Sequence, residues 1–233
     1  MSEPAKPRKS SGSRAKKVPA KGAYHHGDLR RALLDAGLAL IEEQGAQAFT
    51  LREAARRAGV SQAAPYRHFV DKRALLGAIA EEGFRALTAR MREEQAQAGA
   101  PPGNIEPIGM GYLLFAAENP AAYRVMFGPG SRMLEVAESV NEAGTSAFNV
   151  LLDGVAAGQR AGVLRGGDTM ELALFAWSVV HGLALLVIDG LVPVGGVVAG
   201  EDGKNVDPLA LRELAAKVLE LCLVGTSARP GGA

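Results

Sequence analysis

Two short helical segments separated by a glycine limit most strongly how this chain can fold. The segment T-L-R-E that starts at Thr50 has the form of a capping box and predicts the beginning of a short helix. Gly59 permits a left-handed turn after that helix, and Ser61 is suited to cap a third helix over about 62–68. Two short helices joined by such a turn are typical of a helix-turn-helix arrangement.

Helical periodicity continues on both sides of this motif. Apolar residues at positions 29, 33, 36 and 40 share one helical face and predict a helix over about 26–44, which Gly45 can end. Asp71 is suited to cap a long helix that runs to about Ala98. Further helices are expected near 105–118, 120–127, 131–162, 168–189 and 207–224. No run alternates with period two, so the sequence predicts an all-α fold.

Composition divides the chain into regions. The run A-P-P-G-N from Ala100 marks the clearest boundary. We expect a disordered basic tail over 1–23, a helix-turn-helix domain over 24–76, a connecting helix and linker over 77–104, a C-terminal domain over 105–225 and a disordered tail over 226–233. The C-terminal domain is apolar, glycine-rich and mildly acidic, which suits ligand binding or dimerisation.

The net charge of +1 conceals a strong asymmetry. Residues 1–23 carry seven basic groups and one acidic group, whereas residues 76–233 carry eleven basic and eighteen acidic groups. A basic front on an acidic body indicates a polyanionic partner for the front alone. The alternative is that the tail only keeps the chain soluble.

Several classes of protein are disfavoured. Cys222 is the single cysteine, which excludes a disulfide framework and a multi-thiolate metal site and leaves core packing as the simplest role. The pair His25-His26 lacks a third ligand, so we expect no metal and no cofactor. The uncharged run Leu172–Ile188 spans 17 residues and includes His181, which favours a buried helix over a membrane span. Without a signal peptide or membrane segment, we expect a cytoplasmic protein.

The run from Phe49 to Leu76 combines several fixed spacings. It contains Thr50, Ala54, Ala55, Ala58-Gly59-Val60-Ser61, Tyr66, His68-Phe69, Lys72 and Leu75. On these residues the chain resembles, over about 26–76, the DNA-binding domain of TetR-family transcriptional regulators. The resemblance implies that the second short helix enters the major groove of double-stranded operator DNA.

The resemblance also implies roles for individual side chains. Tyr66 and Lys72 would bind phosphates, and the sequence offers no packing role for Lys72. Gln62 would read a base edge, because its amide can pair with adenine. Pro65 departs from the commonest pattern, since it removes a helical hydrogen bond and strains the turn. The remaining expected contacts are Thr50, Arg52, Ala63, Ala64 and His68, of which His68 touches the DNA backbone or simply packs.

The basic tail precedes this domain directly. Its lysines and arginines would add affinity by releasing counterions, or would enter a minor groove. The alternative is that the tail only keeps the chain soluble and does not contact DNA.

A second resemblance covers the C-terminal part. The runs P-A-A-Y-R-V-M-F from Pro120 and A-G-V-L from Ala161, with Trp177 and His181-Gly182, resemble the C-terminal domain of a TetR subgroup with a Trp…His-Gly motif. Trp177 and His181 share a helical face, and an imidazole among aromatic walls suits a small-molecule pocket. The candidate ligand contacts are Phe115, Tyr123, Met126, Phe127, Met133, Phe148, Phe175, Trp177 and His181. The alternative is that these residues fill the core, with His181 bonded to a backbone carbonyl.

The last two predicted helices, with apolar segments over 172–188 and 209–224, are hydrophobic on nearly all faces and need burial beyond one monomer. The resemblance implies a homodimer on a palindromic operator, most simply a repressor released by an unknown small-molecule effector. We expect no enzymatic activity. The alternatives are an all-α enzyme that uses His181 or Cys222, and a non-specific DNA-binding protein driven by the basic tail.

Overall fold

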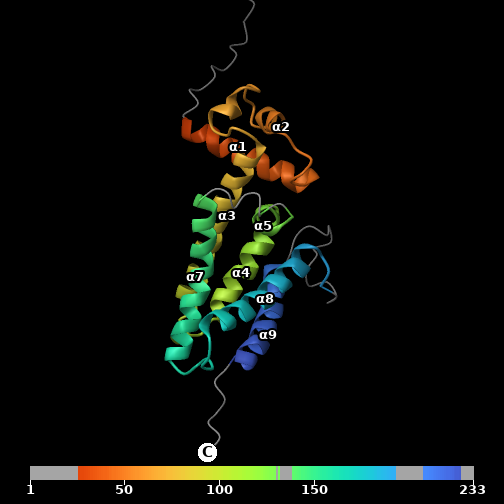
Figure 1. The fold of residues 1–233 in the computed structure, drawn as a ribbon. Helices are drawn as coiled ribbons and strands as arrows, with labels where there is room; N and C mark the ends of the chain where they lie inside the picture. Colours follow the sequence, from red (N-terminus) through yellow and green to blue (C-terminus); the bar gives the residue numbers. More distant parts are fainter. Residues whose placement is uncertain (1–25, 130, 132–137, 193–206, 227–233) are drawn as a thin grey trace, which may run out of the picture.

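The computed structural model describes residues 26–129, 131, 138–192 and 207–226, and these contain helices and no strand (Figure 1). In chain order the elements are α1 His26–Gln44, α2 Leu51–Arg57, the 3-10 helix η1 Ala64–Arg67, α3 Lys72–Gln97, α4 Glu106–Glu118, α5 Pro120–Phe127, α7 Glu138–Arg160, α8 Thr169–Ile188 and α9 Pro208–Thr226. The prediction of an all-α fold is confirmed.

Residues 26–76 form a head at one end of the molecule (Figure 1). The capping box of α2 is complete, because the Glu53 amide donates to Thr50 Oγ1 at 3.2 Å and the Thr50 amide donates to the Glu53 carboxylate at 2.8 Å. Gly59 takes a φ of 69° at the following turn. The interior of the head is apolar and includes Leu33, Leu40, Phe49, Phe69 and Leu75.

The third helix differs from its prediction. In place of an α-helix over 62–68, the chain forms the short 3-10 helix η1, which begins after Ala63 without a side-chain cap. Pro65 is the cause, since it has no N–H to donate to the Ser61 carbonyl. The amide of Ala64 donates to the Ser61 carbonyl instead, at 3.0 Å, and this bond between residues three apart is the pattern of a 3-10 helix. Ser61 therefore does not cap this helix with its side chain.

The long helix α3 runs out of the head and along the body, which comprises the rest of α3 and residues 105–226 (Figure 1). Its neighbour α4 is buried along almost its whole length. The two helices touch closely at Gly111, where a Cβ would lie 2.7 Å from Met91 Cα. The buried apolar side chains of head and body form one continuous cluster, so the head is packed onto the body rather than tethered to it.

The two C-terminal helices close the other side of the body. α8 follows Asp168, whose carboxylate accepts the Glu171 amide at 3.0 Å. α8 is long and apolar enough to cross a membrane by length and composition alone, but it packs against α4, α7 and α9, as a core helix does. α9 reaches Thr226, which is buried and not part of a frayed tail, because its carbonyl accepts the Arg165 amide at 2.7 Å.

Some predicted segments lie outside the described residues. These are the tail over 1–23, residues 24 and 25 of the predicted helix-turn-helix domain, most of the start of the predicted helix over 131–162, and the end of the chain after 226.

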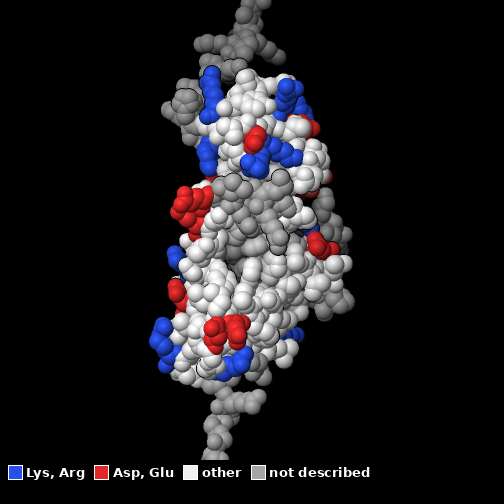
Figure 2. Space-filling model, in the orientation of Figure 1, with Lys and Arg blue, Asp and Glu red and all other residues white. Residues whose placement is uncertain are grey.

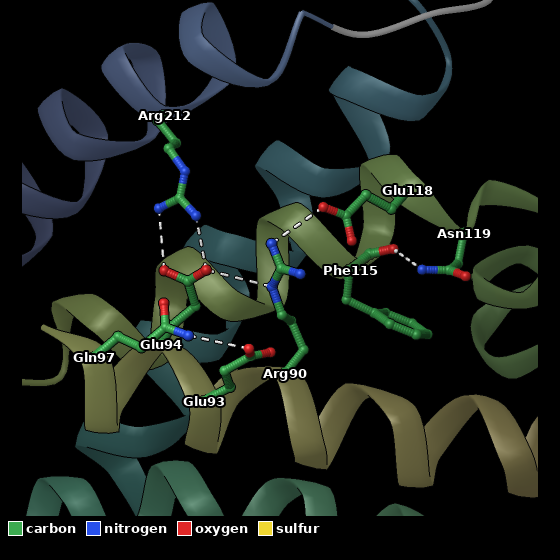
Figure 3. Close-up of polar contacts among 8 residues, drawn as sticks. All are labelled: Arg90, Glu93, Glu94, Gln97, Phe115, Glu118, Asn119 and Arg212. Atoms are coloured by element: carbon green, nitrogen blue, oxygen red, sulfur yellow. Dashed lines mark hydrogen bonds and ion pairs between the residues drawn. The ribbon is translucent and has the colours of Figure 1, made fainter.

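An ion-pair network ties α9 to α3 and α4 (Figure 3). The buried carboxylate of Glu94 in α3 accepts two hydrogen bonds from the guanidinium of Arg212 in α9, at 3.0 and 2.7 Å. Arg90 lies on the other side of Glu94, with its Nε 3.3 Å from the carboxylate, and also donates to Glu118 of α4 at 3.1 Å. The hydrogen bonds from Arg212 lower the pKa of Glu94, which keeps this carboxylate ionised at neutral pH.

Candidate functional site

Basic side chains gather over the head, while much of the body surface seen in the same view is uncharged (Figure 2). Arg57 is neutralised, because its guanidinium donates to Glu43 at 2.6 Å. Four other arginines of the head are exposed and make no ion pair with a described residue: Arg52, Arg56, Arg67 and Arg73. Such free guanidinium groups suit phosphate oxygens.

Sequence reasoning named only Arg52 among these arginines. The other three stand at exposed positions of the motif itself, so their charge and helical spacing were the available signal.

The residues predicted to touch DNA differ in how exposed they are. Thr50, Arg52, Gln62, Ala63 and Tyr66 are exposed, whereas Ala64, His68 and Lys72 are partly buried.

Two of these positions, His68 and Lys72, pack against neighbouring groups, and for His68 packing is one of the two roles that the sequence left open. His68 packs beside Phe69, and its buried Nε2 has no hydrogen-bond partner among the described residues. Lys72 does have a packing role, which corrects the expectation that it has none. Its Nζ donates to the Gln47 carbonyl at 2.7 Å and lies 4.8 Å from the centre of the Phe49 ring. Burial lowers the pKa of Lys72, and its contact with phosphate stays a prediction.

The body contains a cavity of about 640 Å³, within the range typical of small-molecule sites. Its described walls come from α3, α4, α5, α7, α8 and α9. The aromatic and imidazole rings that line it are Phe84, Tyr112, Phe127, Phe148, Trp177 and His181.

Of the predicted ligand contacts, five line this cavity: Met126, Phe127, Phe148, Trp177 and His181. Phe175 does not, because two residues of helix turn it by about 200° from Trp177, and its side chain is exposed. Phe115 and Tyr123 are buried but are not among the wall residues, and Met133 lies outside the described residues.

Four polar groups meet beside the cavity, from Tyr112, Tyr123, Trp177 and His181. The hydroxyl of Tyr112 lies 2.8 Å from His181 Nδ1, and the hydroxyl of Tyr123 lies 2.7 Å from the same nitrogen. The two hydroxyls are 3.0 Å apart, and Trp177 Nε1 donates to the Tyr112 hydroxyl at 3.2 Å. We call these four residues the tyrosine–histidine cluster. His181 therefore contacts two tyrosine hydroxyls through Nδ1, and not the backbone carbonyl that the core-packing alternative expected.

Burial fixes the charge of this cluster. It raises the pKa of Tyr112 to about 12, raises the pKa of Tyr123 further, and lowers the pKa of His181. All three groups are therefore neutral at neutral pH. Sequence reasoning missed Tyr112. The available signal was a hydroxyl in the apolar middle of α4. A buried tyrosine usually finds a hydrogen-bond partner, but this signal does not show which partner.

Other chemistry is sparse in the described part of the chain. No group of three or more His, Cys, Asp or Glu side chains there could hold a metal ion. Cys222 of α9 is buried and lines the cavity, and burial raises the pKa of its thiol. A thiol with a raised pKa is a poor nucleophile at neutral pH.

Known proteins share this architecture. Residues 33–79 match the family model described as Bacterial regulatory proteins, tetR family, and residues 105–199 match the model described as Tetracyclin repressor-like, C-terminal domain. Neither match tests the Trp…His-Gly subgroup, which stays a prediction.

Relatives agree with these matches. The HTH-type transcriptional regulator BetI of Rhizobium meliloti (strain 1021) is 33% identical over 114 residues, which are 46% of this chain and 54% of that protein. The Tetracycline repressor protein class C of Escherichia coli is 46% identical over 52 residues, which are 22% of this chain and 24% of that protein. The chain thus spans about half of the first relative and a quarter of the second.

Similarity to solved structures extends over most of the chain. The structure of a protein with unknown function from Rhodococcus sp. RHA1 is 31% identical with a TM-score of 0.72, and the match covers 89% of this chain and 100% of that one. The helix-turn-helix head, the all-α body and both family matches lead to one conclusion: the chain belongs to the TetR family of DNA-binding transcriptional regulators.

Proposed function

We propose that this protein is a cytoplasmic repressor that binds a palindromic operator as a homodimer and is released when a small molecule occupies the cavity. The observation that carries the proposal is the combination of a basic head with an apolar cavity in one continuously packed molecule. Such packing allows a change at the cavity to reach the head.

We assign contacts with DNA to side chains of the head that are exposed or partly exposed. Gln62 is exposed and presents an amide that suits adenine, while Tyr66, with 52% of its surface exposed, suits a phosphate. Lys72 would use an ammonium hydrogen left over after its bond to the Gln47 carbonyl. The unpaired arginines of the head would add phosphate contacts, which strengthen binding without reading sequence.

The homodimer is supported by apolar side chains that the monomer leaves in water. α8 and α9 expose large hydrophobic residues, namely Leu174, Phe175, Leu185, Leu186, Leu209 and Leu221. Large apolar side chains exposed on two neighbouring helices suit an interaction site, and a two-fold partner would cover the same helices on both subunits.

The route from cavity to head passes through α5. Met126 and Phe127 of α5 line the cavity, and α5 also contacts α1 of the head. Met126 lies so close to α3 that a Cβ at Gly83 would be 2.5 Å from its sulfur. A ligand that displaces Met126 would therefore push on α3 and α5 together. A coupling of about 1–3 kcal/mol would lower DNA affinity roughly 5–150-fold.

Footprinting on the DNA that flanks the protein's own gene tests operator binding. With random competitor DNA near physiological salt, we expect protection of an inverted repeat. Gln62→Ala should lose sequence preference, whereas Lys72→Ala should weaken binding to all sequences and reduce the salt slope by about one. Gln97→Ala is the matched control, because Gln97 is an exposed glutamine at the far end of α3. Equal affinity for unrelated DNA would contradict the proposal and favour the non-specific alternative.

The dimer has its own test. Leu185 and Val163 are each 39% exposed, but only Leu185 lies on α8, since Val163 follows α7. Leu185→Glu should give a monomer in size-exclusion chromatography with light scattering, and Val163→Glu should stay dimeric. A dimer that survives Leu185→Glu unchanged would move the interface away from this face of α8.

A further inference from the structure

The chemistry of the cavity's ligand can be inferred from the hydrogen atoms of the tyrosine–histidine cluster. Two hydroxyl hydrogens, from Tyr112 and Tyr123, must find acceptors within a triangle of atoms separated by 2.7–3.0 Å. If His181 Nδ1 is unprotonated, one hydroxyl donates to it and the other donates to the first hydroxyl oxygen, so both hydrogens are used. If Nδ1 carries a hydrogen, one hydroxyl has no acceptor in the triangle. The tautomer protonated at Nε2 is therefore the one that gives both hydroxyl hydrogens an acceptor within the triangle.

The Nε2–H of His181 is a donor that no described residue accepts from. Both tyrosine contacts are made by Nδ1, and no hydrogen bond joins Nε2 to a described residue. His181 lines the cavity, and its Nε2 is not among the solvent-excluded polar atoms of the described residues. A ligand atom that meets this nitrogen must therefore accept a hydrogen bond.

The remaining walls carry little charge. Among the described lining residues, Glu106 is the one acidic side chain, and no lysine or arginine is present. An anion entering the cavity would lose its hydration without gaining a cationic partner from these walls, and Glu106 would repel it. The described walls therefore disfavour an anion. Glu106, the one acidic partner they offer a cation, lies six residues before Tyr112, about 9 Å along the axis of α4, so a head group beside His181 meets no charged side chain of the described walls.

The two ends of the cavity are lined by different kinds of side chain. Around His181 the walls are aromatic, with the rings of Phe127 and Trp177 centred 5.0 and 5.6 Å from the imidazole. Ile105 directly precedes α4 and lies seven residues before Tyr112. That end is lined by the aliphatic side chains of Ile105 and Ile108, with Glu106 between them on the chain. An aromatic head group thus fits one end and a hydrocarbon tail the other.

We infer that the cavity takes an uncharged, mostly apolar ligand whose aromatic head carries a carbonyl or similar acceptor for the Nε2–H of His181. This inference rests on the proposed function for the biological role of the ligand, but its chemistry can be tested without DNA. The protein has a single tryptophan, Trp177, and it lies in the cavity wall, so its fluorescence reports occupancy directly.

The test titrates the full chain with four probes of similar size: hexanophenone, hexylbenzene, 4-hexylbenzoate and 4-hexylbenzylamine. The ketone has an acceptor next to its ring, hexylbenzene lacks one, and the last two carry a negative and a positive charge at neutral pH. We expect both uncharged probes to bind, and the benzoate to bind at least about a hundredfold more weakly than the ketone. Benzoate or amine binding as tight as that of the ketone would overturn the inference, as would failure of the ketone to bind.

Two variants isolate the hydrogen bond. In His181→Asn the amide oxygen can still accept from the tyrosines but leaves no donor at the position of Nε2. We expect this variant to weaken hexanophenone binding about fivefold while changing hexylbenzene binding less than twofold. Leu151→Ala is the control, because the aliphatic side chain of Leu151 lines the cavity from α7 but cannot hydrogen-bond to the cluster, so its loss should weaken both uncharged probes by similar factors. Circular dichroism verifies that each variant folds. Equal losses for both probes in His181→Asn would remove His181 from ligand recognition.

The two proposals fail separately. If hexanophenone quenches the fluorescence of Trp177 but leaves the operator complex intact at saturation, the inferred ligand class is supported. The proposal that such a ligand releases the operator is then wrong. If the operator complex is instead released by a charged compound that competes for the cavity, the effector role stands and the ligand class falls.

Discussion

The surroundings of two buried glycines, Gly111 where α4 meets α3 and Gly77 where α3 meets α7, predict opposite outcomes for substitution by alanine. At Gly111 of α4, a Cβ would lie 2.7 Å from Met91 Cα and 2.8 Å from the Arg90 carbonyl oxygen, and both are backbone atoms of α3. At Gly77 of α3, the nearest atom is a methyl group of Val140 at 3.9 Å, which is ordinary contact. Alanine fits at Gly77 and does not fit at Gly111.

The magnitudes follow from these distances. Carbon atoms pack best at about 3.5–4.0 Å, so Gly111→Ala must move α4 away from α3 by roughly 1 Å. Overpacking of this kind lowers the free energy of unfolding by about 1–3 kcal/mol. The clash is with backbone atoms, which cannot move aside by changing rotamer, so we expect a loss of about 3 kcal/mol. Alanine regains about 1 kcal/mol of helix propensity. We expect Gly111→Ala to lower the free energy of unfolding by about 2 kcal/mol, and Gly77→Ala to raise it by about 0.5–1 kcal/mol.

Urea denaturation followed by circular dichroism measures both variants. Protein concentration must be held fixed, because a dimer's apparent stability depends on it. Unchanged m-values would show that the midpoint shift reports stability rather than a change in the unfolded state. If Gly111→Ala were as stable as the parent while Gly77→Ala gained stability, the close approach of α3 and α4 would be wrong.

Three further predictions concern polar groups. Glu94→Gln should lower the free energy of unfolding by about 1–2 kcal/mol at pH 7, since the partly exposed Arg212 loses a charged partner. Because the pKa of Glu94 is lowered by folding, its contribution is complete well above 4.5 and is lost as pH falls through the folded value, so the two proteins should converge in acid melts. Thr50→Ala should cost about 1 kcal/mol in thermal melts by removing the acceptor for the Glu53 amide, and Thr50→Ser should restore it. Tyr123→Phe should lower the free energy of unfolding by about 1 kcal/mol in urea denaturation. The loss is smaller than for removing both hydroxyls, because Tyr112 keeps its contact with His181. An unchanged free energy would show that the Tyr123 hydroxyl makes no net contribution to stability.

The regular helices of the head were predictable because local signals agree there. The apolar spacing in 26–44 and the capping box at Thr50 act over one or two turns, so no distant contact is needed to fix them. The third helix failed for an equally local reason. Pro65 removes the amide that an α-helix needs at that position, and this outweighs the capping tendency of Ser61.

The cavity was predictable only in part. Trp177 and His181 could be paired from the sequence because residues four apart share a helical face. The tyrosine partners could not, because Tyr123 and Tyr112 stand 58 and 69 residues from His181 and come from different helices. α4 is buried on all sides, so its sequence has no polar face to show that Tyr112 and not Phe115 faces the cavity.

On the proposed function, α8 carries two surfaces that cannot respond independently. Trp177 and His181 face the cavity from this helix, while Phe175 and Leu185 on the same helix are exposed where a partner would pack. A helix moves as a stiff rod, so a ligand that shifts α8 at the cavity must also shift the dimer surface. The dimer would then choose between two arrangements with different spacing of the heads. The ligand selects between them only by its difference in affinity, so a tightly bound compound that fits both arrangements equally would leave the operator complex intact.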